Sequence, residues 1–382
     1  MSESKIPFHR PFVSGKEAAN LSQVLSNGAF DSDGWFVKKC EQQLRVLTGA
    51  CEVMLTPSCT DALEMAALLC DIEPGDEVVM PSFTFVSSAN PFVLRGARVV
   101  FADVDPRTMN LDPACAEAAI GARTKAMVVT HYGGVAADLE RLKHLAEKHR
   151  ILLIEDAAHA IGATWKEQHL GTIGHLGTLS FHSSKNVHCA EGGALLINDD
   201  SLAARAAILH DKGTDRQKFM RGEAGQYTWV GMGSSFSLSE LNAAFLSAQL
   251  ESVEYVNEER RQIRAIYELE LEDLEKNRQI ELAVLPDHVQ GNAHVFYLKC
   301  NNRGEREKLI RYLSENGVDT RFHYIPLHSA PAGLQFGRFS GEDRHTTSGS
   351  ERLLRLPIYA GLGADSVLRV AALIRRFYDH QH

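Results

Sequence analysis

The segment from Ile151 to His159 constrains the fold more than any other part of the sequence. The apolar residues from Ile151 to Ile154 are followed directly by Glu155 and Asp156. A continuous apolar run, without alternation, predicts a strand that is buried on both faces, as in the parallel sheets of α/β proteins. Such sheets bind ligands at the carboxyl ends of their strands. We therefore expect Asp156 at the edge of the sheet where a ligand binds.

A second stretch, from Leu179 to Gly193, places a single lysine between two apolar runs. The first run ends at Ser180, a polar turn then presents Lys185, and a Glu-Gly-Gly turn leads into the apolar residues 194–197. Burial and nearby cations lower the pKa of a lysine amine and expose its nucleophilic lone pair, which suits covalent catalysis. On this stretch alone, a surface lysine in a loop between two strands explains the pattern equally well.

Lys185 and Asp156 together predict a pyridoxal phosphate site. A lysine on a turn between strands can bond covalently to the aldehyde of this cofactor, and a carboxylate at a strand end can keep its pyridine nitrogen protonated. We expect Lys185 to be both the covalent anchor and the general acid and base. We expect Asp156 to stabilise the negative charge that develops on the substrate carbon, through the protonated ring.

Apolar strands alternate with helices through the first part of the chain. We expect strands near 53–55, 76–80, 98–102, 126–130 and 151–155, and helices at 62–69 and 138–148. This alternation predicts a large α/β domain with a mostly parallel, doubly wound sheet over residues 1–245. A smaller α+β domain is expected over residues 246–382. Its elements are long helices within 239–274 with a bend near Asn257, strands at 294–300 and 318–322, and helices at 306–315 and 365–378.

Composition argues against several classes of protein. The chain has 382 residues, of which 44% are hydrophobic and 23% charged, as in ordinary globular proteins. Its formal net charge of −9 argues against binding to nucleic acid. Seven scattered cysteines without metal-ligand spacing predict free thiols, no metal site and a cytoplasmic location. No apolar run approaches the ~20 residues that cross a bilayer, and residues 1–12 lack the apolar core of a signal peptide, so we expect no membrane association.

The motifs around these residues resemble the DegT/DnrJ/EryC1/StrS family of sugar aminotransferases, over nearly the whole chain from about Ile6 to the C-terminal helix. Within the family, the resemblance is strongest to the bacterial dTDP-4-oxo-6-deoxy-D-glucose 4-transaminases. Together the motifs are specific, whereas any one of them alone is weak. They are Glu-Asp-Ala-Ala-His at 155–159, Ser-Phe-His-x-x-Lys-Asn at 180–186, Glu-Gly-Gly at 191–193, Leu-Thr-Pro-Ser-Cys-Thr at 55–60, Met-Pro-Ser-Phe-Thr-Phe-Val-Ser at 80–87, His-Tyr-Ile-Pro-Leu-His at 323–328 and Ser-Glu-Arg-Leu-Leu-Arg-Leu-Pro at 350–357.

The resemblance implies a fold-type-I aminotransferase that uses pyridoxal phosphate and works as a homodimer. The implied reaction moves an amino group from an amino acid, expected to be L-glutamate, to C4 of a dTDP-4-oxo-6-deoxyhexose, giving a dTDP-4-amino-4,6-dideoxyhexose. The alternatives are amination at C3 or of a UDP- or GDP-linked sugar, and a non-catalytic regulatory protein on the same scaffold. Sugar dehydration is disfavoured because such enzymes carry a histidine where this chain has Lys185. A metal or thiol enzyme is not supported by the scattered cysteines.

The resemblance also assigns residues to the cofactor. Cys59 and Thr60 open a helix after a short strand, a place where free backbone N–H groups bind phosphate, although an ordinary N-cap by Ser58 or Thr60 also explains the turn. By resemblance, Ser180 binds the same phosphate. The remaining assignments are Phe85 stacked on the cofactor ring, His159 at its hydroxyl side, and Ser235 of the partner subunit at the phosphate, in place of the asparagine that is usual in the family.

Two further segments are implied to meet the sugar nucleotide. His323, Tyr324 and His328 lie on a loop rich in polar and aromatic side chains, which in the family lines the sugar pocket. The charged segment 212–229 crosses the dimer interface in the family, near the diphosphate. Arg221 is our candidate there, with Arg216 and Lys218 as alternatives, because the planar fork of an arginine pairs with phosphate oxygens.

Overall fold

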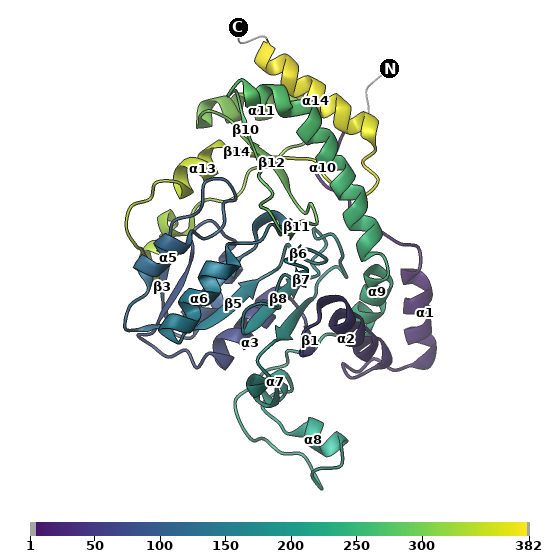
Figure 1. Ribbon diagram of the computed structural model, residues 1–382. Coiled ribbons are helices and arrows are strands. Elements are labelled where there is room, and N and C mark those ends of the chain that lie inside the picture. The colour runs from purple at the N-terminus through teal and green to yellow at the C-terminus, as the bar shows by residue number, and fades with distance from the viewer. Residues whose placement is uncertain (1–4, 380–382) are drawn as a thin grey trace.

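An eight-stranded sheet forms the centre of the protein in a computed structural model, which describes residues 5–379 (Figure 1). One strand, β9 (Gly193–Ile197), is antiparallel to both of its neighbours, and the other seven run parallel to one another. The predicted mostly parallel sheet is therefore confirmed. The strands in spatial order are β1 (Glu52–Thr56), β9 (Gly193–Ile197), β8 (Leu176–Ser180), β5 (Leu152–Asp156), β4 (Thr124–Thr130), β2 (Glu77–Pro81), β3 (Arg98–Ala102) and β13 (Gly337–Phe339).

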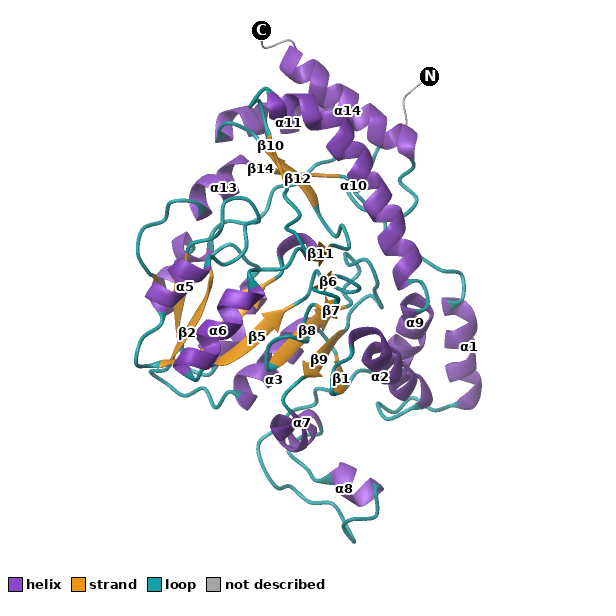
Figure 2. Ribbon diagram, viewed as in Figure 1, coloured by secondary structure: helices purple, strands orange, loops and turns teal. Residues whose placement is uncertain are grey.

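Helices cover both faces of this sheet, as a doubly wound fold requires (Figure 2). One face packs against α3 (Cys59–Leu69), α4 (Asn90–Leu94) and α7 (Ala203–His210). The other face packs against α2 (Trp35–Thr48), α5 (Pro113–Ala119), α6 (Leu139–His149) and α9 (Glu240–Leu250), with α1 (Glu17–Asn27) outside α9. Each layer buries the apolar stripe of its helices against the apolar strands, so two hydrophobic cores enclose the sheet.

Strand β5 shows why the apolar run at 151–154 constrains the fold. It lies in the interior of the sheet between β4 and β8, and Leu153 and Ile154 are fully buried. Asp156 ends the strand opposite Thr130 of β4 and Thr178 of β8. The predicted position of Asp156, at the carboxyl edge of a parallel sheet, is confirmed.

The C-terminal part builds its own small core above the edge of the large sheet. A three-stranded antiparallel sheet, in the order β10 (Glu281–Leu282), β12 (Phe296–Lys299) and β14 (Leu353–Leu356), packs against helices at the top of Figure 1. These helices are α10 (Val253–Lys276), α11 (Arg303–Glu315) and α14 (Ala364–Asp379). Buried Tyr267 of α10 stacks on Phe296 of β12, with ring centroids 4.8 Å apart.

The remaining elements are short and connect the two parts. A second three-stranded sheet has the order β11 (Val289–Gln290), β6 (Thr164–Trp165) and β7 (Gln168–His169). The short helices are α8 (Arg216–Met220), α12 (Pro331–Phe336) and α13 (Thr346–Arg352), and the 3₁₀ turns are η1 (Val86–Ser88), η2 (Tyr132–Gly134), η3 (Asp200–Leu202) and η4 (Leu327–Ser329).

The two parts of the chain exchange segments across the boundary expected at residue 245. That position lies inside α9, while the break between the long helices comes after Leu250. Strand β13 returns from the C-terminal part to the edge of the large sheet, beside β3. Ile6, near the N-terminus, is buried in the core of the C-terminal part. These crossings hold the two parts together around the space between them.

The bend predicted near Asn257 is wrong, because the helical break lies at residues 251–252, between α9 and α10. Asn257 is fully buried within α10 and its side chain bonds across the structure instead of disrupting its own helix. It accepts a hydrogen bond from Asn186 Nδ2 at 2.8 Å and donates one to the carbonyl of Ile161 at 3.0 Å. Asparagine has a modest intrinsic helix propensity, and here tertiary hydrogen bonds override it.

The strand predicted at 318–322 is also wrong. Val318 forms a single bridge to Ile6, and Arg321 a single bridge to Arg355. The predicted loop 323–331 contains the 3₁₀ turn η4 and the first residue of α12. Residues 318–322 therefore connect α11 to the following loop and do not add a strand to the small sheet.

A glycine at the start of β9 sets the distance between this strand and α3. A Cβ atom on Gly193 would lie 2.4 Å from the backbone nitrogen of Cys59 and from the carbonyl carbon of Ser58. Real Cβ atoms do not approach backbone this closely, so a larger residue would displace the start of α3. The Glu-Gly-Gly motif therefore positions the helix N-terminus at the edge of the sheet.

Candidate active site

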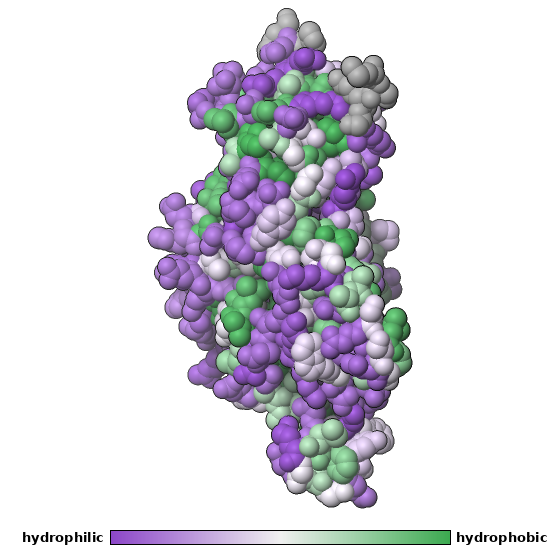
Figure 3. All heavy atoms as spheres, turned by 90° about the vertical axis from the view of Figure 1, so that its right-hand side faces the viewer, coloured by the Kyte–Doolittle hydropathy of each residue, from purple (hydrophilic) through white to green (hydrophobic). Residues whose placement is uncertain are grey.

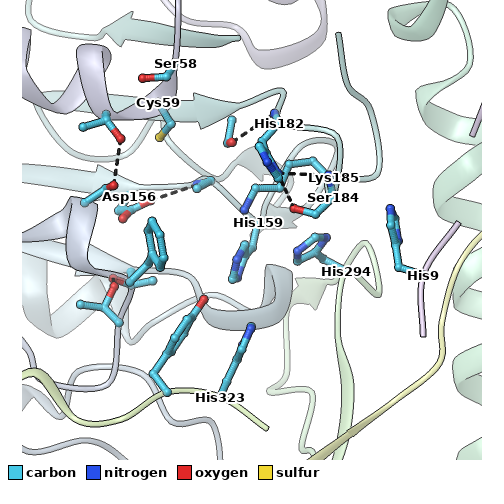
Figure 4. A pocket seen from close by; sticks show the side chains of 18 of the residues that line it. His9, Ser58, Cys59, Asp156, His159, His182, Ser184, Lys185, His294 and His323 are labelled. Atoms are coloured by element: carbon cyan, nitrogen blue, oxygen red, sulfur yellow. Dashed lines mark hydrogen bonds between the residues drawn. The ribbon is translucent and has the colours of Figure 1, made fainter. Parts of the chain in front are cut away.

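A cavity of about 620 Å³ lies where the carboxyl edge of the large sheet faces the C-terminal part (Figure 4). The large sheet contributes the ends of β5 and β8, and α3 contributes its first residues. Segments around Phe8, His294, His323 and Arg355 close the opposite side. The cavity thus combines distant parts of the sequence, including both Lys185 and Asp156.

Lys185 follows β8 on a turn, and its side chain is half-buried in the cavity wall. Its backbone N–H donates to the carbonyl of His182 at 2.9 Å, which closes the turn. Burial lowers the pKa of the Lys185 amine to about 8, Cys59 and Asp156 act in the opposite direction, and the positive charge of Arg355 lowers it further. About a tenth of the amine is therefore unprotonated, and nucleophilic, at pH 7, far more than for an ordinary lysine.

The carboxylate of Asp156 is held by a chain of hydroxyl groups. Ser88 donates to Oδ2 at 2.6 Å, and the backbone N–H of Ala158 donates to Oδ1 at 3.2 Å. Behind Ser88, Thr84 Oγ1 lies 2.7 Å from Ser88 Oγ and 3.0 Å from Thr130 Oγ1. These bonds fix the orientation of a carboxylate that is almost completely buried. Sequence reasoning missed the three hydroxyls; their only signal was their position after β2 and at the end of β4.

The N-terminus of α3 forms one end of the cavity. Ser58 caps this helix, because its Oγ accepts from the backbone N–H of Asp61 at 3.2 Å and donates to the Asp61 carboxylate at 2.7 Å. Cys59, Thr60 and Ser180 line the same end. Burial raises the pKa of the Cys59 thiol to about 12, so this side chain packs and does not act as a nucleophile. The helix N-terminus with a nearby serine suits a phosphate group.

His159 and His294 form a pair of neutral imidazoles beside Lys185, with ring centroids 4.3 Å apart. His159 Nδ1 accepts from the backbone N–H of Gly133 at 3.3 Å, so its Nε2 carries the hydrogen. His294 Nδ1 donates to Asn186 Oδ1 at 2.8 Å, so its Nε2 is an acceptor. Burial, together with the positive charge of Lys185, holds the pKa of both rings well below its usual range.

The bond to His294 fixes the backbone next to Lys185. Asn186 Nδ2 donates to Asn257 Oδ1 at 2.8 Å and to the carbonyl of Asn292 at 3.0 Å. The side chains of Asn186, Asn257 and His294 are all buried. Their hydrogen bonds connect the lysine turn to the C-terminal part. Sequence reasoning treated His294 only as a strand residue, because nothing in the sequence relates it to Asn186.

His323 and Tyr324 both line the cavity. Figure 4 shows His323 on the wall opposite Ser58 and Cys59. The rings of His323 and Tyr324 stack with centroids 4.0 Å apart. His323 Nε2 accepts from Arg355 Nη1, and its Nδ1 lies 3.2 Å from the hydroxyl of buried Tyr132. Phe85 also lines the cavity and leaves 57% of its surface exposed there, which makes its ring available for stacking.

His328 lies outside the cavity, in contrast to the prediction that it contacts the substrate. Its Nδ1 is 2.7 Å from Ser82 Oγ, and its Nε2 pairs with Asp343 at 3.2 Å. The backbone N–H of His328 also donates to Ser82 Oγ at 3.0 Å. These contacts attach the loop that carries His323 to the end of β2. We interpret His328 as a residue that positions this loop.

Arg221 and Ser235 also lie away from the cavity of their own chain. Both are exposed on the segment 212–235, which projects from the body of the molecule (Figure 1). Arg221 pairs with Glu223 at 2.6 Å, and Ser235 forms a backbone bridge with Asp211. A role at the active site therefore requires a partner subunit for both residues. Residues 5–379 contain no cluster of three or more histidine, cysteine or acidic side chains that is arranged to hold a metal ion.

Comparison with known proteins identifies the family. The model described as DegT/DnrJ/EryC1/StrS aminotransferase family matches residues 12–375. The chain belongs to this family. A pleiotropic regulatory protein of Geobacillus stearothermophilus is 32% identical over 362 residues, 94% of each chain. The structure of the aminotransferase TlmJ from Streptoalloteichus hindustanus has a TM-score of 0.88 at 29% identity and 100% coverage of both chains. DesV of S. venezuelae, in complex with a ketimine intermediate, has a TM-score of 0.88 at 28% identity and 98% coverage of both chains.

This member of the DegT/DnrJ/EryC1/StrS family is a fold-type-I sugar aminotransferase that depends on pyridoxal phosphate. The cavity fits that cofactor on its own chemistry. It offers an N-terminal helix end for a phosphate, an oriented carboxylate for a ring nitrogen, an exposed aromatic face and one lysine of lowered pKa. Within residues 5–379, no helix is long and apolar enough to cross a bilayer.

The lowered pKa of Lys185 predicts a distinctive pH dependence. An amine reacts only when it is unprotonated, so a lower pKa shifts its reactivity to lower pH. In the cofactor-free protein, trace acetylation of Lys185 by acetic anhydride should reach half of its maximum near pH 8. A model lysine peptide in the same tube should reach it near pH ~10.4. The reactions are run at pH values from about 6 to about 11, which bracket both midpoints. Mass spectrometry of the Lys185 peptide and of the model peptide then measures the two midpoints. A midpoint for Lys185 at or above that of the peptide would contradict the buried environment.

Proposed function

We propose that this enzyme transfers the amino group of L-glutamate to C4 of a dTDP-linked 4-oxo-6-deoxyhexose. The observation that carries the proposal is the composition of the cavity wall. Thr84, Phe85 and Ser87 come from one segment that resembles the 4-transaminases, and His323 and Tyr324 come from another. The residues on which the resemblance rests therefore face the space that a sugar must occupy.

Pyridoxal phosphate, when bound, supplies an electron-accepting ring that lets an amino group leave one carbon and join another. Lys185 would anchor the cofactor and would then move the proton at the substrate carbon. Asp156 keeps a proton on the ring nitrogen, and Ser88 orients its carboxylate. His159 would offer its Nε2–H to the hydroxyl side of a bound cofactor ring, and Phe85 would stack on the ring and exclude water.

The phosphate end is assigned to the N-terminus of α3, with Cys59, Thr60 and Ser180. Thr60 Oγ1 donates to Ser87 Oγ at 2.8 Å, so the first turn of the helix is joined to the segment that carries Phe85. A phosphate held at this end would leave the ring to Lys185 and Asp156, which line the same cavity. The serine that replaces the family's asparagine, Ser235 of a second subunit, completes this end in our proposal.

The choice between C3 and C4 rests on the cavity and not on the cofactor chemistry. Lys185 and Asp156 serve either reaction. A shift of the carbonyl by one ring carbon moves the reacting atom by more than about 1 Å, enough to spoil the attack geometry. The walls around His323 and Tyr324 must therefore select one orientation of the sugar, and the resemblance of this segment favours C4.

A regulatory role is the second candidate, because one relative carries the name of a pleiotropic regulatory protein. A protein that only senses a ligand would tolerate the loss of Lys185 or Asp156. Both are present here, and each is held by a network of bonds: Asp156 by Ser88 and Ala158, and the lysine turn by Asn186. Burial of an amine and a carboxylate costs solvation energy, and groups of this kind with perturbed pKa values gather at catalytic sites. The presence of both residues therefore supports catalysis.

We further propose that the enzyme is a homodimer, in which the arm of each subunit (residues 212–235) reaches the partner's active site. The arm bears the strongly exposed side chains of Tyr227, Trp229 and Met232, with Trp229 79% exposed. Figure 3 shows this region as a separate lobe that carries hydrophobic beside polar residues. Soluble proteins seldom leave such a cluster uncovered.

The free thiols of all seven cysteines support a cytoplasmic location.

Product analysis tests the proposed substrate. The enzyme is offered dTDP-4-oxo-6-deoxyglucose and its 3-oxo isomer separately, each with L-glutamate, and NMR locates the new amine. We expect amination at C4, with a preference of at least ~100-fold in kcat/KM, because misplaced reacting atoms lose about that factor. Preference for the 3-oxo sugar, or for a UDP- or GDP-linked sugar, would refute this substrate while the aminotransferase assignment remains.

Mixing of two inactive variants tests the dimer. Lys185→Ala removes the covalent anchor, and replacement of residues 226–232 by a short glycine-serine linker removes the apolar part of the arm. Each variant alone should be inactive. Refolded together, they should form mixed dimers in which one of the two sites combines an intact Lys185 from one subunit with an intact arm from the other. With random pairing about half of the dimers are mixed, so about a quarter of wild-type activity should return. A shared site would be contradicted if both variants fold but their mixture recovers no activity, and if the wild-type enzyme is fully active as a monomer.

A further inference from the structure

Arg355 places a positive charge in the cavity wall without an acidic partner. It lies on β14, lines the cavity, and is half-buried. Within residues 5–379 its side chain forms one hydrogen bond, from Nη1 to His323 Nε2, and its Nε is buried without a partner. A guanidinium has five N–H donors in a fixed fork, so most of its hydrogen-bonding capacity is unused.

The groups around Arg355 do not neutralise it. Its guanidinium lies over the ring of Phe8, with 4.7 Å between its central carbon and the ring centroid. The groups with acidic character that interact with its charge are Tyr132 and Tyr324, and burial raises the pKa of both phenols, so they remain uncharged. Arg260 adds a second buried positive charge to the wall, although its donors are occupied by the carbonyls of Ala293 and His294. This side of the cavity therefore lacks a negative charge.

The cofactor phosphate does not supply this charge in the proposed arrangement. Figure 4 shows Ser58 and Cys59 at one side of the cavity and His323 at the other, with Asp156, Lys185 and His159 between them. Arg355 is bonded to His323 and hence belongs to the side away from α3. An anion at Arg355 must therefore come from a substrate.

The two substrates differ in where they carry negative charge. An amino acid carries its α-carboxylate on the same carbon as the amino group, so the carboxylate must lie within a few bonds of Lys185. A nucleotide-linked sugar carries its diphosphate on C1, across the ring from the carbonyl at C4. Only the amino acid presents an anion close to the reacting carbon, where Arg355 and Lys185 line one cavity.

We propose that Arg355 is the residue that binds the α-carboxylate of the amino donor, through the guanidinium N–H groups that His323 leaves free. The inference rests on the proposed transaminase reaction only in that an amino acid enters this cavity; it does not depend on which sugar follows. Charge-assisted, forked pairing with a carboxylate is the interaction to which arginine is best suited. When the donor leaves as its keto acid, the bond from Arg355 to His323 remains, and the cavity can receive an uncharged sugar ring.

Separate half-reactions test this proposal with Arg355→Gln, which keeps size and hydrogen bonding but removes the charge, and Arg355→Lys, which keeps the charge but removes the fork. Arg321→Gln is the matched control. Arg321 pairs with Arg355 through the backbone, but its side chain donates to the carbonyl of Thr320 and does not line the cavity. The loss of cofactor absorbance on mixing the loaded enzyme with L-glutamate alone reports the donor half. Aminated enzyme mixed with keto-sugar reports the sugar half.

We expect Arg355→Gln to lower kcat/KM for L-glutamate by about a hundredfold, the scale of an interfacial charge pair that loses one partner. Arg355→Lys should lose about tenfold, and both variants should keep the sugar half within about threefold of the parent. The calorimetric affinity of the loaded enzyme for glutarate, a dicarboxylate without an amine, should fall in the same order. Arg321→Gln should change none of these values by more than about twofold.

Two outcomes would overturn the proposal. Equal losses in both half-reactions, with unchanged glutarate affinity, would make Arg355 a structural residue. A loss confined to the sugar half would assign Arg355 to the sugar nucleotide. If Arg355→Gln fails to fold, Arg355→Lys and the glutarate titration still decide between these results. Wild-type enzyme that reacts with L-glutamate but with none of the keto-sugars would refute the proposed sugar and leave the test of Arg355 intact.

Discussion

The active site depends on one constraint: an amine and a carboxylate must share a largely buried space without forming a simple ion pair. Burial lowers the pKa of Lys185 to about 8, and Arg355 on the far wall reinforces the effect. Asp156 remains oriented because Ser88 and the backbone of Ala158 bond to it. A direct ion pair would satisfy both groups and leave neither available to a cofactor. The networks around each residue prevent this, and the fold supplies them from β2, β4 and the C-terminal part.

The parallel sheet explains why these two residues meet. Asp156 ends β5 opposite Thr178 of the neighbouring β8, and Lys185 follows β8 on the next turn. Gly193 allows the start of α3 to approach the same edge. The C-terminal part then closes the cavity with Tyr324, His294 and residues of β14. Because α9 and α10 carry the chain into that part and β13 returns to the large sheet, the two walls of the cavity are connected at both sides.

The sequence predicted the elements whose signal is local. The apolar run before Asp156, the lysine turn, and the capped start of α3 are each visible within about ten residues, and motifs of that length also carried the family resemblance. It did not predict contacts that depend on tertiary folding. Ser88, His294 and Arg355 belong to strands and turns that look ordinary in isolation. Asn257 was misread for the same reason, since its partners Asn186 and Ile161 are remote in sequence. The family resemblance implies that the whole loop with His323 and His328 lines the sugar pocket, whereas the ring of His328 contacts Ser82 and Asp343.

The most direct test of the account is the identity of the lysine that bonds to the cofactor. Purified enzyme loaded with pyridoxal phosphate is reduced with borohydride, which makes that bond permanent, and is then digested and mapped by mass spectrometry. We predict a yellow protein that bleaches on reduction, with one cofactor on the peptide that contains Lys185 and none on Lys212, the next lysine in the sequence. A cofactor on any other lysine, or a protein that retains none after reduction, would contradict the assignment of this cavity as the catalytic centre.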